Sequence, residues 1–400
     1  MSDFDFATRL KGVELPVSHA IMNRVRELRG QGIEVINFGT KGDTPKRAKE
    51  AAIKMLDSED AAYYTDSKGL IELRQAIARK LQVGNDIEAD PQTDIIVTLG
   101  GMEGLFSSIM AVVDRGDEAL VDDPGWFSFE PIIRLAGATP VPVPSLEANG
   151  FGFNVERLRE KITSRTKLLI LCNPDNPTGR VLDRSDLEAI AQLAREFNFV
   201  VIVDEAYENF TYDGRKHVSL ASLDGMWQRT ITIQTVSKIY NMFGWRIGWI
   251  VADKDVIRSI LAVHSRAVGC PVSFAQAGAA AVLGDTLAQG DVPISQIVKN
   301  YELQRNAMVE GLVSIPGVTC GKPAGAYFTF PNIKSFGLSS VEMATYLLEE
   351  ARVATTPGSA FGALGEGHLR LVINAPVEEI ERGVAKLGHA LAKLKAGGST

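Results

Sequence analysis

The stretch "SKIYNMFGWRIGW", from Ser237 to Trp249, sets a lysine and an arginine in an otherwise apolar run. Its large apolar side chains indicate a buried position, where an uncompensated charge is very costly. Lys238 and Arg246 must therefore be compensated by something other than water. The run follows the β-branched segment "RTITIQTV", so both charges are expected near the end of a strand.

Similar apolar segments recur on both sides of this stretch. Short β-branched runs alternate with longer amphipathic segments, a pattern that predicts an α/β fold. Because the runs are apolar almost throughout, they are expected to form a sheet covered by helices on both faces. The predicted strands are 94–101, 118–124, 139–144, 166–174, 199–207 and 229–238, and helices are predicted over 102–113 and over 185–198 with a start at Ser185.

The pattern changes after about residue 285. Long amphipathic segments such as 296–315 are followed by a few short strand-like runs at 325–333 and 368–375. We predict a large domain over 46–285 and a smaller α+β domain formed by 1–45 together with 286–400. No linker rich in proline, glycine or serine marks the boundary.

Composition excludes several classes of function. The 400 residues carry a formal charge of −7 without long runs of one sign, which argues against a nucleic acid or an anionic membrane as partner. No apolar segment has the length of a signal peptide or a membrane span, so a cytoplasmic protein is expected. The three cysteines and five histidines are widely spaced and predict neither a disulfide framework nor a metal site.

Four strand ends carry residues suited to ligand binding, since ligands of open α/β sheets bind beyond the carboxyl ends of the strands. In "TLGGMEG", Gly100 and Gly101 allow a close backbone approach before a helix, which suits a phosphate. In "CNPDNPTG", Asn176 can donate a hydrogen bond into a pocket. Each of these two segments is also compatible with an ordinary turn.

The third strand end is "VIVDEAY", where Asp204 follows an apolar run. Its carboxylate needs a cationic partner, which could be a protonated ring nitrogen, a structural arginine or a helix N-terminus. The fourth end carries Lys238 and Arg246. One cofactor would satisfy all four ends, because pyridoxal phosphate has a phosphate, an aldehyde for a lysine, a phenolic oxygen and a pyridine nitrogen.

At this point the sequence resembles a known family. It is similar to the aspartate-aminotransferase-like proteins, the fold type I pyridoxal-phosphate enzymes of the class I/II aminotransferases. The likeness implies a mostly parallel seven-stranded sheet and transfer of an amino group between an L-amino acid and a 2-oxo acid by a ping-pong mechanism, in a homodimer with shared active sites. The motifs that carry it are, in order, "YYTDSKGLIELRQAIA", "TLGGMEGL", "DDPGWFSFE", "NPDNPTGR", "VDEAY", "SKIYNMFGWRIGW", "GAYFTF", "PGSAFG" and "HLRLVI".

The resemblance also implies roles for individual residues. Lys238 would bind the aldehyde covalently and act as general base, and Asp204 would pair with the pyridine nitrogen. Arg370 would clamp the substrate carboxylate, which Gly39 and Asn176 would approach as well. The other implied cofactor contacts are Tyr207 and Asn176 at the phenolic oxygen, Trp126 on the ring face, Ser237, Arg246 and the amides of Gly100, Gly101 and Met102 at the phosphate, and Tyr64 from the second subunit.

Two departures from the family pattern leave the substrate and the reaction open. The segment "NFGTKGDTP" is shorter than the corresponding family loop, of the type GxGEPDFDTP, and Phe243 stands where a small residue is common. The alternative is other chemistry at a Cα carbanion, such as β- or γ-elimination or carbon–carbon bond formation. A catalytically silent regulatory protein is the second alternative, although the lysine is retained and no DNA-binding appendage is recognisable.

Overall fold

The computed structural model describes residues 6–10, 13, 18–39, 42–289 and 292–397. A seven-stranded sheet has the order β1-β7-β6-β5-β4-β2-β3, and a three-stranded sheet has the order β8-β10-β9. The predicted α/β class with a mostly parallel seven-stranded sheet is confirmed. The strands are β1 (Ile95–Thr98), β2 (Glu118–Asp123), β3 (Thr139–Pro144), β4 (Thr166–Cys172), β5 (Val200–Asp204), β6 (Thr230–Thr235), β7 (Gly248–Val251), β8 (Phe328–Thr329), β9 (Thr356–Pro357) and β10 (Leu369–Val372).

The six strands predicted for the large sheet all form. The seventh, β7, is antiparallel to both of its neighbours and begins at Gly248, the last residue but one of "SKIYNMFGWRIGW". Its first residue, Gly248, passes so close to the turn before α4 that an added Cβ would lie 2.8 Å from the carbonyl carbon of Gly100. Glycine is therefore required where the strand meets that turn.

Helices pack around both sheets. The helix predicted over 102–113 begins two residues earlier, at Gly100. The helix predicted to begin at Ser185 is capped instead by Asp183, whose side chain accepts a hydrogen bond from the N–H of Asp186 at 2.9 Å. The helices are α1 (Ser18–Gly30), α2 (Lys46–Leu56), α3 (Ile71–Gly84), α4 (Gly100–Val112), α5 (Phe129–Leu135), α6 (Val155–Lys161), α7 (Arg184–Glu196), α8 (Lys254–Ala267), α9 (Ser273–Gln289), α10 (Val292–Val313), α11 (Ser340–Ala351) and α12 (Val377–Gly397).

The large sheet is covered on both faces, as predicted. In β1, Ile95 packs in one hydrophobic cluster with residues of α3 and α9, whereas Ile96 packs in another with residues of α4. Strand β3 is one of the two edge strands, and prolines occupy every second position of its sequence "TPVPVP". Because proline has no N–H to donate, this alternation suits an edge strand that is paired on one side.

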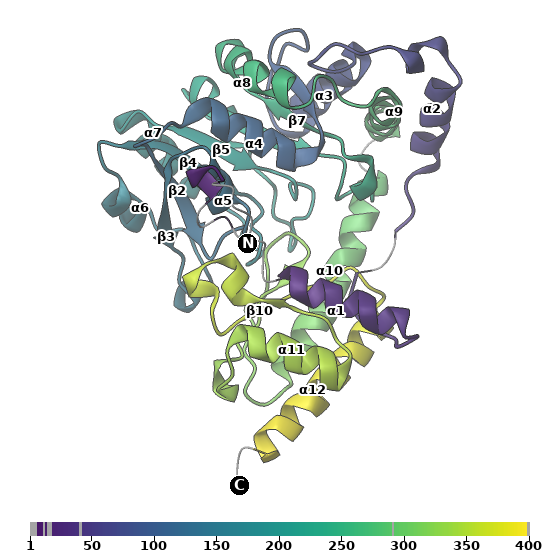
Figure 1. Cartoon of the computed structure of the whole chain (residues 1–400), viewed down its shortest axis with the longest axis vertical. Helices are drawn as coiled ribbons and strands as arrows, with labels where there is room; N and C mark the ends of the chain where they lie inside the picture. The colour runs from purple at the N-terminus through teal and green to yellow at the C-terminus, as the bar shows by residue number, and fades with distance from the viewer. Residues whose placement is uncertain (1–5, 11–12, 14–17, 40–41, 290–291, 398–400) are drawn as a thin grey trace.

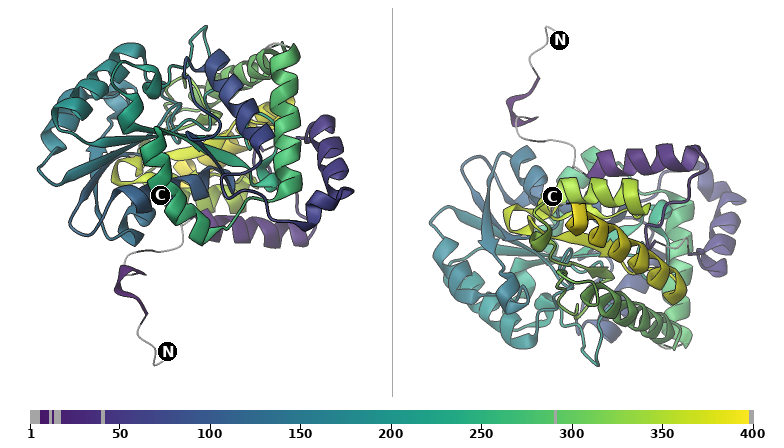
Figure 2. Two further views of the ribbon diagram at one scale, coloured as in Figure 1. Left: turned by 90° about the horizontal axis from the view of Figure 1, so that it is seen from above. Right: turned by 90° about the horizontal axis from the view of Figure 1, so that it is seen from below.

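Residues 18–39 pack with the C-terminal part of the chain in the smaller layer. Arg24 of α1 donates to Glu349 of α11 at 2.6 Å, and Ile36 forms a parallel bridge with Val353. Figure 1 shows α1, α11 and α12 together below the large sheet, and Figure 2 shows the same layer from below. These contacts join residues 18–39 to the C-terminal part of the chain, whereas Thr8–Leu10 packs against α5; the division into 46–285 and a second domain of 1–45 with 286–400 stays a proposal. In the part of the chain that the structure describes, no helix is both long and apolar enough to cross a membrane.

Candidate active site

A cavity of about 220 Å³ lies at the carboxyl ends of β4, β5 and β6. Parallel strands end at the same edge of a sheet, so residues far apart in the sequence meet there. Most of the residues predicted from the strand ends line this one cavity. They are Gly101, Met102, Trp126, Asn176, Asp204, Tyr207, Ser237, Lys238 and Arg246, and Phe243 joins them.

Asp204 and Lys238 line the cavity with opposite charges. Burial raises the pKa of the Asp204 carboxyl to about 6, since loss of water outweighs the hydrogen bond from the N–H of Ala206 and the attraction of Lys238. Burial also lowers the pKa of the Lys238 amine to about 8, although Asp204 attracts its proton. A lysine that loses its proton this easily can act as a nucleophile or a general base.

Arg370 of β10 is held beside Asn176. Its Nη1 donates to the Asn176 Oδ1 at 2.9 Å, and its Nη2 lies 3.4 Å from the Thr356 hydroxyl. The guanidinium carbon lies 4.5 Å from the centre of the Phe328 ring and 4.9 Å from that of Phe361. Burial lowers the pKa of Arg370, and among the described residues no carboxylate pairs with it. Its planar fork is thus positioned to receive an anion from outside the protein.

A second arginine stands at the N-terminus of α4. Arg246 donates to the carbonyl oxygens of Phe243 at 3.0 Å and Leu99 at 3.3 Å. Gly100 has a φ of +75°, and a Cβ there would lie 2.4 Å from the Arg246 Nη2, so only glycine allows this approach. The helix has no side-chain N-cap, which leaves its first N–H groups available to an anion.

Comparison with known proteins gives the family of the chain. Residues 34–387 match the family model of aminotransferase class I and II. The chain belongs to the class I and II aminotransferases. The resemblance inferred from the motifs is therefore confirmed, and the chain is an aminotransferase.

The relatives of this aminotransferase have different substrates in their names. It is 41% identical to an aspartate aminotransferase of Pyrococcus abyssi over 88% of this chain and 90% of that protein. It is 38% identical to an aromatic-amino-acid aminotransferase of Thermococcus litoralis over 91% and 94% of the two chains. The solved aspartate aminotransferase of Thermus thermophilus with maleate superposes with a TM-score of 0.90 at 32% identity and covers 97% of this chain and 100% of its own.

Four of the predicted residues of this aminotransferase do not line the cavity: Gly100 and Arg370 contact residues that do, whereas Tyr64 and Gly39 lie elsewhere. Tyr64 is 96% exposed and borders a different, largely apolar cavity near α2 and α9. Gly39 forms a bridge with Asn374, just beyond the end of β10. The shortened loop that begins at Gly39 includes residues 40–41, which lie outside the described residues.

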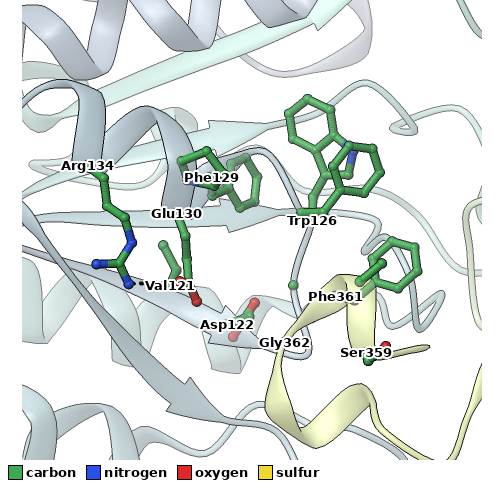
Figure 3. A pocket seen from close by; sticks show the side chains of 13 residues that line it. Val121, Asp122, Trp126, Phe129, Glu130, Arg134, Ser359, Phe361 and Gly362 are labelled. Carbon is green, nitrogen blue, oxygen red and sulfur yellow. Dashed lines mark hydrogen bonds and ion pairs between the residues drawn. The ribbon is translucent and has the colours of Figure 1, made fainter. Parts of the chain in front are cut away.

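Aromatic side chains surround the site more closely than the motifs indicated. Tyr327 and Phe328 both pack on the ring of Tyr207, and the Tyr327 ring lies 6.0 Å from the Lys238 Nζ. Trp126 and Phe361 also border a second cavity, between the loop after β2 and the turn at Gly358–Phe361 (Figure 3). Tyr327 and Phe328 belong to the motif "GAYFTF" and Phe361 belongs to "PGSAFG", but the sequence alone indicates no role for these three residues.

Behind the end of β5 lies a buried polar group that no motif predicts. Possible ligand atoms of Glu205, Glu208 and His217 lie within 4.8 Å of one another. Lys80 donates to Glu208, and the Gln234 amide donates to each of the two glutamates at 2.9 Å. The lysine and the amide donate hydrogen bonds to the two carboxylates, so the protein's own groups account for this cluster without a metal ion.

Proposed function

We propose that this aminotransferase binds pyridoxal phosphate in the cavity at Lys238 and uses it to exchange an amino group between an L-amino acid and a 2-oxo acid. One observation carries the proposal: the same site contains a lysine of lowered pKa, a buried carboxyl, and two arginines that lack a carboxylate partner among the described residues. The cofactor, when bound, supplies an electrophilic carbon and an electron-accepting ring.

The residues present fit the separate parts of this cofactor. The Asp204 carboxyl accepts a hydrogen bond from the N–H of Ala206, and it can keep a proton on a ring nitrogen. Arg246 and the N-terminus of α4 suit the phosphate. Trp126 offers a flat apolar face to the ring, and the site contains Tyr207 and Asn176 for the phenolic oxygen.

Lys238 has two tasks in this proposal. It would hold the cofactor covalently in the resting enzyme, where attachment also removes the cost of a buried ammonium. When a substrate amine displaces it, its amine is neutral and can accept the proton that leaves the substrate Cα. The aromatic side chains around it, Tyr207, Phe243 and Tyr327, limit the access of water to that amine.

The product distribution tests the proposed function. The protein is incubated with each of a panel of L-amino acids and with pyruvate or 2-oxoglutarate as acceptor. We expect one new amino acid to form for each 2-oxo acid that is released, without ammonia. Stoichiometric release of ammonia would show elimination instead, and the proposed exchange would then be wrong.

We propose that Arg370 binds the substrate α-carboxylate, with Asn176 and Gly39 beside it. Replacing Arg370 by lysine is expected to lower kcat/KM for the amino acid about 10- to 150-fold, because lysine keeps the charge but loses the two-pronged geometry. Steady-state kinetics of Arg370→Lys against wild type provide the measurement.

The matching decarboxylated amine is the control for Arg370. It cannot make the carboxylate contact, so its rate should change little between wild type and Arg370→Lys. An equal loss for the amine and the amino acid would show that Arg370 supports the fold or the cofactor rather than the substrate carboxylate.

We also propose a homodimer in which Tyr64 reaches the phosphate site of the second subunit. Tyr64 and Tyr63 are 96% and 73% exposed, and Ile53 and Leu56 of the nearby α2 are also exposed. Such apolar exposure indicates a surface that another chain covers. The three cysteines are unpaired, which supports the proposed cytoplasmic location.

Mixed dimers test the sharing of sites. Chains with Tyr64→Phe are co-expressed with chains carrying Lys238→Ala, each with its own affinity tag, and the doubly tagged dimer is isolated. We expect one of its two sites to combine both defects and the other to be intact, so that about half of the wild-type activity remains. If every functional site behaves like that of the Tyr64→Phe homodimer, Tyr64 acts within its own subunit.

A further inference from the structure

A buried histidine contacts the first turn of α4 through the side chain of Glu103. His264 of α8 is fully buried, and its Nδ1 lies 3.0 Å from the Glu103 Oε1. Its Nε2 lies 2.8 Å from the carbonyl oxygen of Ser67. The other oxygen of Glu103 accepts the N–H of Leu99 at 3.2 Å, so the carboxylate sits directly at the start of the helix.

The two contacts of His264 determine the charge of the pair. The Ser67 carbonyl can only accept, so the Nε2 must carry a proton. The Nδ1 then faces a carboxyl oxygen at hydrogen-bond distance, which requires one more proton between these two atoms. Whether the histidine or the glutamate holds that proton, the pair as a whole carries no net charge.

This neutrality matters for the anion site at the same helix end. The N–H groups of Gly100, Gly101 and Met102, which we propose as phosphate contacts, directly precede Glu103 in the sequence. A bare carboxylate in the first turn would occupy the positive end of the helix dipole and repel a phosphate dianion. The Glu103 side chain is only 12% exposed, so water would screen this repulsion weakly.

We propose that His264 is a positioning residue for the cofactor phosphate: it shares a proton with Glu103 and so keeps the first turn of α4 free of negative charge. The inference rests on the proposed function, because it presupposes that this turn binds the phosphate of pyridoxal phosphate. His264 itself touches neither cofactor nor substrate in this account. It acts through Glu103.

A double-mutant cycle tests the proposal by binding rather than by activity. Dissociation constants for pyridoxal phosphate are measured on cofactor-free wild type, His264→Gln, Glu103→Gln and the double variant, with His389→Gln as a matched control at an exposed histidine. We expect His264→Gln to bind about 10-fold more weakly or worse, because Glu103 then keeps only the neutral donors Leu99 N–H and Ser107 Oγ, and its charge faces the phosphate. Glu103→Gln, the double variant and His389→Gln should remain within about threefold of wild type.

Pyridoxal, which lacks the phosphate, separates this role from a structural one. Its dissociation constant should change less than about threefold in all variants, since the effect acts only on the phosphate. Equal weakening of pyridoxal and pyridoxal phosphate by His264→Gln would overturn the proposal. A double variant as weak as His264→Gln would overturn it too, since removal of the carboxylate should restore binding.

Two further outcomes are decisive. If His264→Gln does not fold, as judged by circular dichroism, Glu103→Gln decides alone: unchanged affinity supports a neutral pair, whereas tighter binding shows that the wild-type pair carries a net negative charge and overturns the inference. If wild type itself binds neither pyridoxal phosphate nor inorganic phosphate, the proposed function fails, and this inference fails with it. Normal binding by wild type with no effect of His264→Gln overturns this inference only.

Discussion

Replacing Lys238 by alanine is expected to lower kcat for amino-group transfer by about 10,000-fold, the largest effect of any single substitution. A general base contributes typically 100- to 10,000-fold, and this variant also loses the covalent hold on the cofactor. The structure supports the assignment because burial lowers the pKa of this amine to about 8 in a cavity that contains Asp204. Steady-state turnover with the best amino acid and acceptor gives the measurement.

Lys299→Ala serves as the control for the Lys238 prediction. Lys299 is an exposed lysine of α10 that does not line the cavity, and its loss should leave kcat unchanged. If Lys238→Ala keeps more than about one hundredth of the wild-type kcat while its fold is intact, Lys238 is not the general base.

The second large effect is expected at Asp204. Its replacement by alanine should lower kcat on the order of 100-fold or more, because a positioned charge in a water-excluded site is worth a few kcal/mol. Cofactor binding should fall far less, since the phosphate contacts at Arg246 and α4 remain. The measurement compares kcat with the dissociation constant of pyridoxal phosphate for the same variant.

Asp204→Asn refines this second prediction. It keeps the shape of the side chain and removes its charge, so it should be nearly as slow as Asp204→Ala if the charge matters. Near-normal turnover of either variant would exclude the assigned role of Asp204 at the ring nitrogen.

The sequence predicted the strands of the large sheet well because a buried strand must be apolar along its whole length. The apolar pattern did not reveal β7. This strand has only four residues, and it follows directly on the apolar run that contains Lys238 and Arg246. It also overestimated the strand at 325–333, of which only Phe328–Thr329 pair within the small sheet. Gly325 begins that run and Pro331 interrupts it. The pairing of such short strands depends on tertiary contacts more than on the local sequence pattern.

The residues of the site were likewise predictable only where the local sequence is informative. Asp204, Lys238 and Arg246 were identifiable because a charge beside an apolar strand needs a partner. By contrast, the pair of His264 and Glu103 joins residues 161 positions apart, on helices whose own periodicity says nothing about which residues meet. Burial, distance and the choice of hydrogen-bond partners had to come from the folded structure.

Covalent trapping of the cofactor tests the central claim most directly. The purified protein is saturated with pyridoxal phosphate, reduced with borohydride and digested, and the labelled peptide is identified by mass spectrometry. The account predicts a yellow protein that carries one reduced adduct per chain, on Lys238 within "TVSKIYNMFGWR". An adduct on a different lysine, or none on a protein that still transfers amino groups, would contradict it.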